Sequence, residues 1–316
     1  MTSFAFIFPG QGAQAVGMGR ELADAYPSAR AVFEEVDEAL GLSLSRVIFE
    51  GPEADLMLTA NTQPALMAVS LAVMRALEVE FGVKAQEARL LAGHSLGEYS
   101  ALAAGGALSV GDAARLLRRR GLAMQAAVPV GDGAMAALIG KVDVALAEEI
   151  AAEGAREGVV VVANDNNVGN VVISGLRSGV DAAIAAAKAR GVRAVPLAVS
   201  APFHSPLMAP AARDMAEALA SAALSAPCSP LVANVTARPV SDPQEIRRLL
   251  VEQVTARVRW RESVEWMASP EGGITRFVEV GSGKQLTGMV KRNAPEAAAI
   301  ALNTPADLEV FARSRS

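Results

Sequence analysis

Short apolar runs and amphipathic stretches alternate along the first third of the chain. Phe4–Phe8 is an apolar run closed by Pro9-Gly10, and residues 89–92 form a second run that leads into Gly93. Runs of this kind, bounded by turn residues, are typical of buried strands. Apolar residues recur at helical spacing over residues 29–40, 64–81 and 98–104. Strands that alternate with helices predict an α/β fold with a mostly parallel sheet covered on both faces.

The middle of the chain has a different order of segments. Strand, helix, strand, strand, helix and strand patterns follow one another over residues 135–140, 143–154, 159–163, 170–174, 179–190 and 192–199. The polar stretch Asn164-Asp165-Asn166-Asn167 is expected to be the loop between the two central strands. The order βαββαβ predicts a small ferredoxin-like subdomain. We place it at residues 129–201, inserted into a larger domain of residues 1–128 and 202–316, because Val128-Pro129-Val130-Gly131 and Ser200-Ala201-Pro202 carry residues typical of boundaries.

Gly93-His94-Ser95-Leu96-Gly97 lies where a predicted strand meets a predicted helix. The sequence G-x-S-x-G in that context is the pattern of a nucleophile elbow, a tight turn that presents a serine at a helix N-terminus. The free N–H groups there favour negative charge. The pattern predicts that Ser95 is a catalytic nucleophile; the alternative is a glycine-rich turn with an ordinary serine.

A serine nucleophile needs a general base, which is most often histidine. The chain has two histidines, His94 and His204. His94 shares the tight turn with Ser95, so we expect its side chain to be directed away from the serine hydroxyl. His204 lies between Pro202 and Pro206, which fix its loop, and it is therefore the predicted base. No acidic residue stands out as the third member of a triad.

One arginine lies on the apolar face of a predicted helix. The helix covers residues 112–125 and is expected to be N-capped near Asp112. Its apolar face consists of Ala113, Leu116, Leu117, Ala123 and Met124. Arg120 falls near the centre of that face, whereas Arg115, Arg118 and Arg119 lie mostly away from it. A buried arginine is costly unless an anion pairs with it, and that anion is either a distant carboxylate of the protein or the carboxylate of a ligand.

Composition limits the classes of protein to consider. The chain has 316 residues, of which 52% are hydrophobic and 20% charged, which favours a sizeable core over disorder. The net charge of −5 argues against a general nucleic-acid-binding protein. The single cysteine, Cys228, excludes an intramolecular disulfide and a cysteine metal cluster, and two histidines argue against a histidine-rich zinc site. Without an apolar stretch of about 18 residues or a basic N-terminal segment, we expect a cytoplasmic protein with no membrane partner.

The glycine-rich loop after the first predicted strand permits a rival interpretation. Gly10-x-Gly12-x-x-Ala15 loosely fits the dinucleotide fingerprint of NAD-dependent oxidoreductases. That fingerprint requires an acidic residue at the end of a second strand about 20 residues later. Here Glu34 and Glu35 lie in a helical pattern instead. A loop of free N–H groups opposite the elbow fits part of an oxyanion hole better.

A set of short motifs resembles one enzyme family over essentially the whole chain. The motifs are Phe8-Pro9-Gly10-Gln11-Gly12, Asn61-Thr62-Gln63-Pro64-Ala65, Gly93-His94-Ser95-Leu96-Gly97-Glu98, Arg120-Gly121-x-x-Met124-Gln125, Pro202-Phe203-His204-Ser205, Asn234-Val235-Thr236, Val251-Glu252-Gln253 and Glu279-Val280-Gly281. Together they resemble the malonyl-CoA:acyl-carrier-protein transacylases of dissociated fatty-acid synthesis and the acyltransferase domains of polyketide synthases. Asn170 is a departure, since the family pattern leads us to expect glutamine there.

The resemblance implies a fold and a set of catalytic roles. It implies an α/β-hydrolase-like core that carries a ferredoxin-like subdomain, in agreement with the order of segments above. Ser95 would be the nucleophile and His204 the base, and the backbone carbonyl of Gln253 would orient His204 in place of an acid. The backbone N–H groups of Gln11 and Leu96 would form the oxyanion hole.

The resemblance also implies a substrate and its contacts. Arg120 would bind the malonyl carboxylate with Gln63 nearby, and the bulky ring of Phe203 would select malonyl over methylmalonyl groups. The malonyl group would move from malonyl-CoA through a malonyl-serine to the phosphopantetheine thiol of holo acyl carrier protein, without a metal or bound cofactor. We expect a monomer.

Two further expectations concern partners and alternatives. The carrier protein is acidic in this family, so a basic docking patch is expected, with Lys284, Lys291 and Arg292 as candidates. A stand-alone polyketide-type acyltransferase or an acyltransferase subunit of a malonate decarboxylase would share the same motifs. A serine esterase or thioesterase would use the same Ser95 and His204 but would pass the acyl group to water.

Overall fold

A six-stranded sheet forms the centre of the larger part of the molecule, in a computed structural model that describes residues 3–199 and 201–314. Its order is β10 (Ala298–Leu302), β9 (Arg276–Val280), β1 (Phe4–Phe8), β2 (Leu90–Gly93), β7 (Leu231–Ala233) and β8 (Arg238–Val240). Neighbouring strands are parallel except β7 and β8, which form an antiparallel hairpin at one edge. Phe8 pairs with Gly93, so the loops that follow β1 and β2 leave the sheet side by side.

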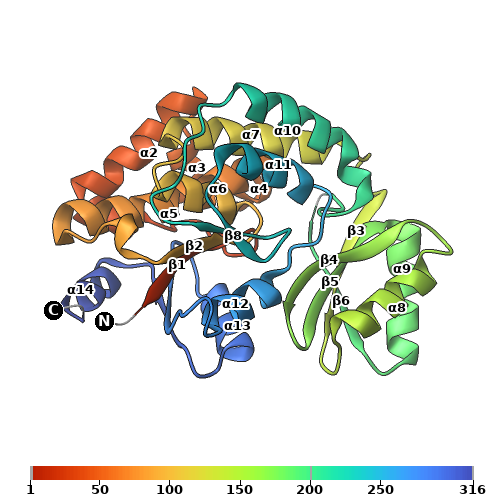
Figure 1. Cartoon of the computed structure of the whole chain (residues 1–316). Helices are drawn as coiled ribbons and strands as arrows, with labels where there is room; N and C mark the ends of the chain where they lie inside the picture. Colours follow the sequence, from red (N-terminus) through yellow and green to blue (C-terminus); the bar gives the residue numbers. More distant parts are fainter. Residues whose placement is uncertain (1–2, 200, 315–316) are drawn as a thin grey trace.

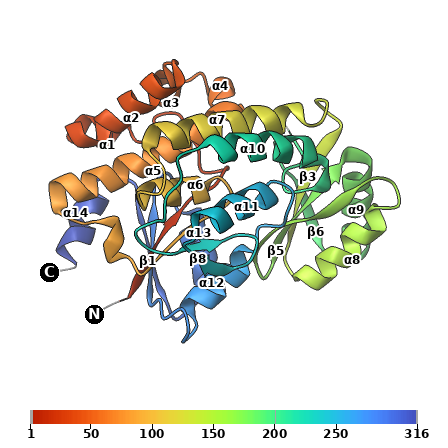
Figure 2. The same ribbon diagram turned by 45° about the horizontal axis from the view of Figure 1, so that its top comes forward.

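Alternate residues of β1 supply the two cores above and below this sheet. Phe6 and Phe8 belong to the cluster beneath the larger helical layer, and Ala5 and Ile7 pack on the other side. Figures 1 and 2 show helices on both faces of the sheet. The larger layer includes α2 (Pro27–Leu40), α5 (Thr59–Phe81), α6 (Gly97–Ala104), α7 (Val110–Ala126), α10 (Ala209–Ser221), α11 (Pro243–Gln253) and α14 (Pro305–Arg313), and the smaller has α12 (Trp260–Ala268) and α13 (Gln285–Asn293).

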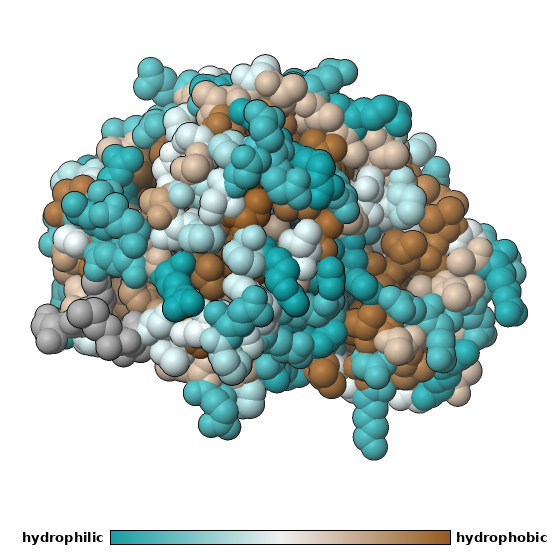
Figure 3. All heavy atoms as spheres, viewed as in Figure 1, coloured by the Kyte–Doolittle hydropathy of each residue, from teal (hydrophilic) through white to brown (hydrophobic). Residues whose placement is uncertain are grey.

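Shorter helices and 3₁₀ turns complete the larger part of the molecule. They are α1 (Arg20–Ala25), α3 (Leu44–Glu50), α4 (Glu53–Met57) and two 3₁₀ turns, Ala85–Glu87 and Pro206–Met208. Hydrophilic and hydrophobic residues are interspersed on the face shown in Figure 3. Within residues 3–199 and 201–314, none of the helices combines the length and the apolar character needed to cross a membrane.

A separate four-stranded antiparallel sheet lies to one side of the larger part (Figure 1). Its order is β4 (Val160–Asn167), β5 (Asn170–Leu176), β3 (Gly133–Ile139) and β6 (Arg193–Pro196), and α8 (Val144–Gly154) and α9 (Arg177–Ala189) pack on it around their own apolar core. The chain order β3-α8-β4-β5-α9-β6 is the predicted βαββαβ, and the predicted α/β fold with this subdomain is confirmed. Ser200, part of the second predicted junction, lies outside the described residues.

The prediction of a polar loop at Asn164–Asn167 was wrong, because these residues belong to β4. All four are buried, and the ladder between β4 and β5 has irregular register within this stretch. Two of the four side chains bond to the larger part of the molecule rather than to water. Asn166 contacts His94, and the Asp165 carboxylate forms an ion pair with Arg261.

Two predicted helix starts also need correction. The helix that carries Arg120 begins at Val110, and its N-cap is Ser109 rather than Asp112. The Ser109 hydroxyl accepts the Asp112 backbone N–H at 3.0 Å, so Asp112 lies in the first turn. The helix predicted from Pro64 begins earlier, at Thr59, because extensive burial of α5 outweighs the one hydrogen bond that Pro64 cannot make.

Candidate active site

The turn between β2 and α6 places Ser95 just beyond the carboxyl end of a central strand, in a strained conformation. Ser95 has φ 53°, in the left-handed region that side chains other than glycine rarely adopt. The glycines on either side leave no room for a side chain. A Cβ on Gly93 would lie 1.9 Å from the carbonyl carbon of Gly97, and a Cβ on Gly97 would lie 2.3 Å from the Phe8 oxygen. Both glycines are therefore required for the close approach of β1, β2 and α6.

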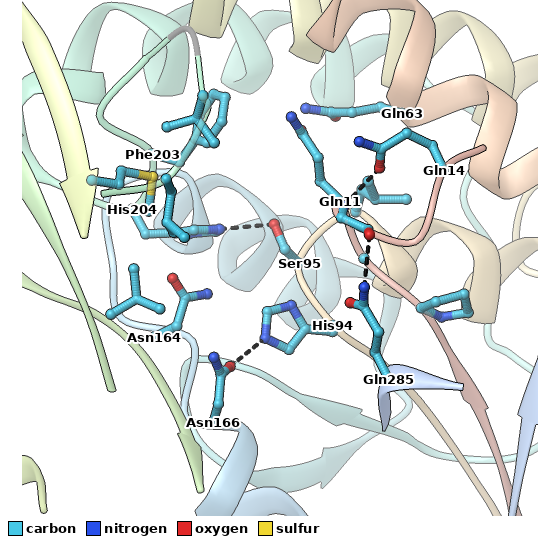
Figure 4. A pocket seen from close by; sticks show the side chains of 18 of the residues that line it. Gln11, Gln14, Gln63, His94, Ser95, Asn164, Asn166, Phe203, His204 and Gln285 are labelled. Carbon is cyan, nitrogen blue, oxygen red and sulfur yellow. Dashed lines mark hydrogen bonds between the residues drawn. The ribbon is translucent and has the colours of Figure 1, made fainter. Parts of the chain in front are cut away.

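His204 contacts the Ser95 hydroxyl, in the arrangement of a nucleophile and its base (Figure 4). The Ser95 Oγ lies 2.8 Å from His204 Nε2, and His204 Nδ1 lies 2.9 Å from the Gln253 carbonyl oxygen. A carbonyl only accepts, so Nδ1 carries the proton and Nε2 is free to accept the serine proton. His204 also has a positive φ, 55°, which aims the ring at the turn.

The carbonyl that orients His204 lies at the C-terminal end of a helix. Gln253 is the last residue of α11, so its carbonyl accepts no hydrogen bond within the helix. It also lies at the negative end of the helix dipole. That partial negative charge favours the imidazolium that forms when the serine proton moves. The carbonyl thus stands where a carboxylate stands in a Ser-His-Asp triad.

Arg120 is buried beside the nucleophile, with 1% of its surface exposed. Its guanidinium donates to Gln63 Oε1 at 2.8 Å, Gln253 Oε1 at 2.9 Å and Ser95 Oγ at 3.1 Å. All three acceptors are uncharged, its Nε–H has no partner, and in the described part of the chain it forms no ion pair. The sequence left two possible partners for this arginine, a carboxylate of the protein or the carboxylate of a ligand. Among the described residues, no protein carboxylate pairs directly with it. An anionic ligand fits the vacant donor capacity.

A cavity of about 510 Å³ lies over this cluster, between the two sheets. Ser95, His204, Arg120, Gln63 and Phe203 line it (Figure 4 labels all but Arg120). From the small subdomain Met135, Asn164, Asn166, Asn170 and Val172 close its other side. Gln253 acts from behind and does not line it.

The backbone N–H groups of Gln11 and Leu96 are free at one end of this cavity. Both residues line it, and neither N–H donates to another residue in the described ranges. Leu96 is the N-cap of α6, so its free N–H also lies at the positive end of a helix dipole. This pair can bind a developing oxyanion.

Comparison with known families is consistent with this geometry. The model of the acyl transferase domain matches residues 5–305. The chain belongs to the acyl transferase domain family. The malonyl CoA-acyl carrier protein transacylase of Escherichia coli (strain K12) is 46% identical over 307 residues, covering 96% of this chain and 97% of that protein.

Solved structures agree with this acyltransferase over nearly its full length. The acyl-carrier-protein-S-malonyltransferase of Bartonella henselae superimposes with a TM-score of 0.96 at 52% identity, covering 99% of each chain. A malonyl-transacylase solved in complex with its type II PKS acyl-carrier protein has a TM-score of 0.94 at 41% identity and covers 100% of both chains.

Burial and charge tune the acid–base groups of the acyltransferase. Burial, followed by the positive charge of Arg120, lowers the pKa of His204 to about 3. Burial raises the pKa of Glu98 to about 8, although the N–H donors of Asn234 and Gln253 and the charge of Arg120 act in the opposite direction. His204 is therefore neutral at physiological pH, the state that a general base needs.

Several residues in the site were given no role by sequence reasoning. The Asn234 side chain accepts the Ser95 N–H at 2.8 Å and donates to the Gly93 carbonyl at 2.7 Å, which holds both ends of the turn. His94 turns from the serine to Asn166, at 2.9 Å, and so ties the elbow to β4. The signals were present, since Asn234 and Glu98 stood in the quoted motifs, but their partners lie far away in sequence.

The candidate docking residues lie on one side of the cavity. Lys284 is the N-cap residue of α13, Lys291 and Arg292 are in its last turn, and all three are exposed. Leu286 and Met289 of the same helix line the cavity. A docking role for the three basic residues remains a prediction.

Proposed function

We propose that this acyltransferase moves a malonyl group from malonyl-CoA to the phosphopantetheine thiol of acyl carrier protein, for fatty-acid synthesis. The names of the relatives support the acyl group and the carrier. The observation in this chain that carries the proposal is Arg120. Its buried guanidinium has no carboxylate partner among the described residues and lies 3.1 Å from Ser95 Oγ, so the carboxylate of an acyl group attached to Ser95 is within reach of its donors.

In the first half-reaction the Ser95 oxygen attacks the thioester carbonyl while His204 Nε2 takes its proton. The oxyanion is held by the N–H groups of Gln11 and Leu96, a donor pair of a kind worth about 10²–10³ in rate per donor. The C–S bond then breaks, and His204 returns the proton to the departing coenzyme A sulfur. The product is a malonyl ester on Ser95.

The second half-reaction reverses these roles with a different thiol. His204 takes the proton of the carrier's phosphopantetheine thiol, the sulfur attacks the ester carbonyl, and the C–O bond to Ser95 breaks as the proton returns to its oxygen. This scheme uses no metal or bound cofactor. We propose further that the enzyme is a cytoplasmic monomer. The ring of Phe203 would limit the space beside the acyl group and so select malonyl over methylmalonyl groups.

Intact-protein mass tests the proposal directly. The protein is mixed briefly with malonyl-CoA and weighed, then weighed again after holo acyl carrier protein is added. A malonyl adduct that moves to the carrier supports transfer. An adduct that decays equally fast without the carrier indicates an esterase, and no adduct at all contradicts the proposal.

The depressed pKa of His204 predicts an unusual pH profile for the first half-reaction. A histidine with an ordinary pKa near 6.5 would be only about 3% neutral at pH 5, so a base of that kind would slow about 30-fold from pH 8 to pH 5. With a pKa of about 3, His204 stays neutral throughout the range from pH 5 to 7. We expect the rate of Ser95 acylation, followed by rapid quench and mass, to change less than about twofold across that range. A tenfold fall in an enzyme still folded at pH 5 would contradict the assignment.

A further inference from the structure

The Gln253 side chain lies between a carboxylate and a guanidinium group. Its Nε2 donates to Glu98 Oε2 at 2.5 Å and to the Ser95 backbone carbonyl oxygen at 3.0 Å, and its Oε1 accepts from Arg120 Nη2 at 2.9 Å. Glu98 and Arg120 are each 1% exposed, and Gln253 is fully buried. The two charged groups therefore face each other through one amide rather than as an ion pair.

The chemistry of the three groups allows this amide only one orientation. The other Glu98 oxygen, Oε1, accepts the Asn234 backbone N–H at 2.6 Å, so both oxygens face donors as the ionised form requires. A carboxylate only accepts and a guanidinium only donates. If the Gln253 amide flipped, its oxygen would face Glu98 and its NH₂ would face Arg120, and both contacts would be repulsive.

We propose that Glu98 is a positioning residue for the recognition of the substrate carboxylate. By fixing the Gln253 amide, it directs the amide oxygen at Arg120 and so holds the guanidinium beside Ser95. Because the amide separates them, the ionised form of Glu98 balances the charge of Arg120 without occupying the donors that the substrate needs. This inference rests on the proposed function, since the carboxylate concerned is that of the malonyl group.

The replacement Glu98→Gln tests this orientation with almost no change in shape. Its NH₂ must face either the Asn234 N–H or the Gln253 NH₂, and in the second case the two NH₂ groups repel and displace the Gln253 amide from Arg120. At pH 8.5, where the native Glu98 is mostly ionised, we expect the ratio of malonyl to acetyl transfer, each measured as kcat/KM, to fall about tenfold. Acetyl transfer should change less, because the Gln253 backbone carbonyl still contacts His204.

Two comparisons separate a positioning role from a structural one. In an Arg120→Ala background, Glu98→Gln should change the ratio less than about twofold, because the group through which it acts is gone. Glu279 is the matched control, since it is also a buried glutamate with a donor at each oxygen, here the backbone N–H groups of Leu286 and Thr287. Glu279→Gln should leave the ratio unchanged. If Glu98→Gln does not fold, Gln253→Met removes the same amide, keeps the carbonyl, and should lower the ratio as much.

The outcomes distinguish this inference from the proposed function. An unchanged ratio in folded Glu98→Gln overturns the inference, as does an equal fall in the Arg120→Ala background or in Glu279→Gln. When Gln253→Met stands in for an unfolded Glu98→Gln, an unchanged ratio overturns it in the same way. A native enzyme that forms no malonyl adduct at all overturns the proposed function first.

Discussion

Replacing Ser95 with alanine is expected to abolish the malonyl adduct and to lower transfer to the carrier by about 10⁶-fold, the scale seen when a serine nucleophile is removed from an enzyme of comparable design. Ser95 Oγ is the hydroxyl that contacts His204, and it lies at the turn that both flanking glycines and Asn234 hold in place. The measurement is intact-protein mass after mixing with malonyl-CoA, followed by assay of malonylated carrier.

The matched control for this change is Ser100→Ala. Ser100 is a buried serine of α6 whose hydroxyl has no hydrogen-bond partner among the residues that the structure describes, so its loss should leave labelling intact. Adding His204→Ala to Ser95→Ala should cost little more, because the two residues act as a unit. A full malonyl adduct on folded Ser95→Ala would show that the nucleophile is another residue.

Arg120→Ala is expected to lower kcat/KM for malonyl transfer by about tenfold to a hundredfold, whereas kcat/KM for acetyl transfer should fall much less. The loss corresponds to about 1.5–3 kcal/mol for a hydrogen-bonding partner of a charged group. An acetyl group has no carboxylate to pair with Arg120, so its transfer depends on Ser95 and His204 but not on the Arg120 guanidinium. The measurement is kcat/KM for the two acyl-CoA substrates with the same carrier.

Arg119→Ala is the control for this second prediction. Arg119 is the neighbouring residue on α7 but is exposed, and it forms ion pairs with Asp214 and Glu217 on α10. Surface pairs of this type contribute about 0–1 kcal/mol, so neither substrate should be affected noticeably. Equal losses for malonyl and acetyl transfer in Arg120→Ala would contradict a carboxylate-binding role.

Local patterns predicted the elements that position the site because each depends on neighbours in sequence. Phe4–Phe8 and the elbow at Ser95 are a strand and a turn whose signals lie within five residues. Arg120 was singled out because helical spacing alone places it among apolar residues, and it is indeed buried.

Patterns failed where a polar side chain has its partner in another part of the chain. Asp165 and Asn166 were predicted to lie in a loop, yet they belong to β4, and their side chains bond to Arg261 and His94 of the larger domain instead of to water. The link from Glu98 to Gln253 spans 155 positions, so no local pattern contains it. Which acceptor faces which donor is decided only when distant segments pack.

The use of a main-chain carbonyl at Gln253 has a consequence for how this enzyme can vary. In a triad with an acid, one nucleotide change can remove the orienting group. Here every amino acid at position 253 supplies the same carbonyl to His204, so point substitution there spares the base and alters only what the side chain does. Evolution can therefore retune the acyl group accepted beside Arg120 without dismantling the catalytic pair.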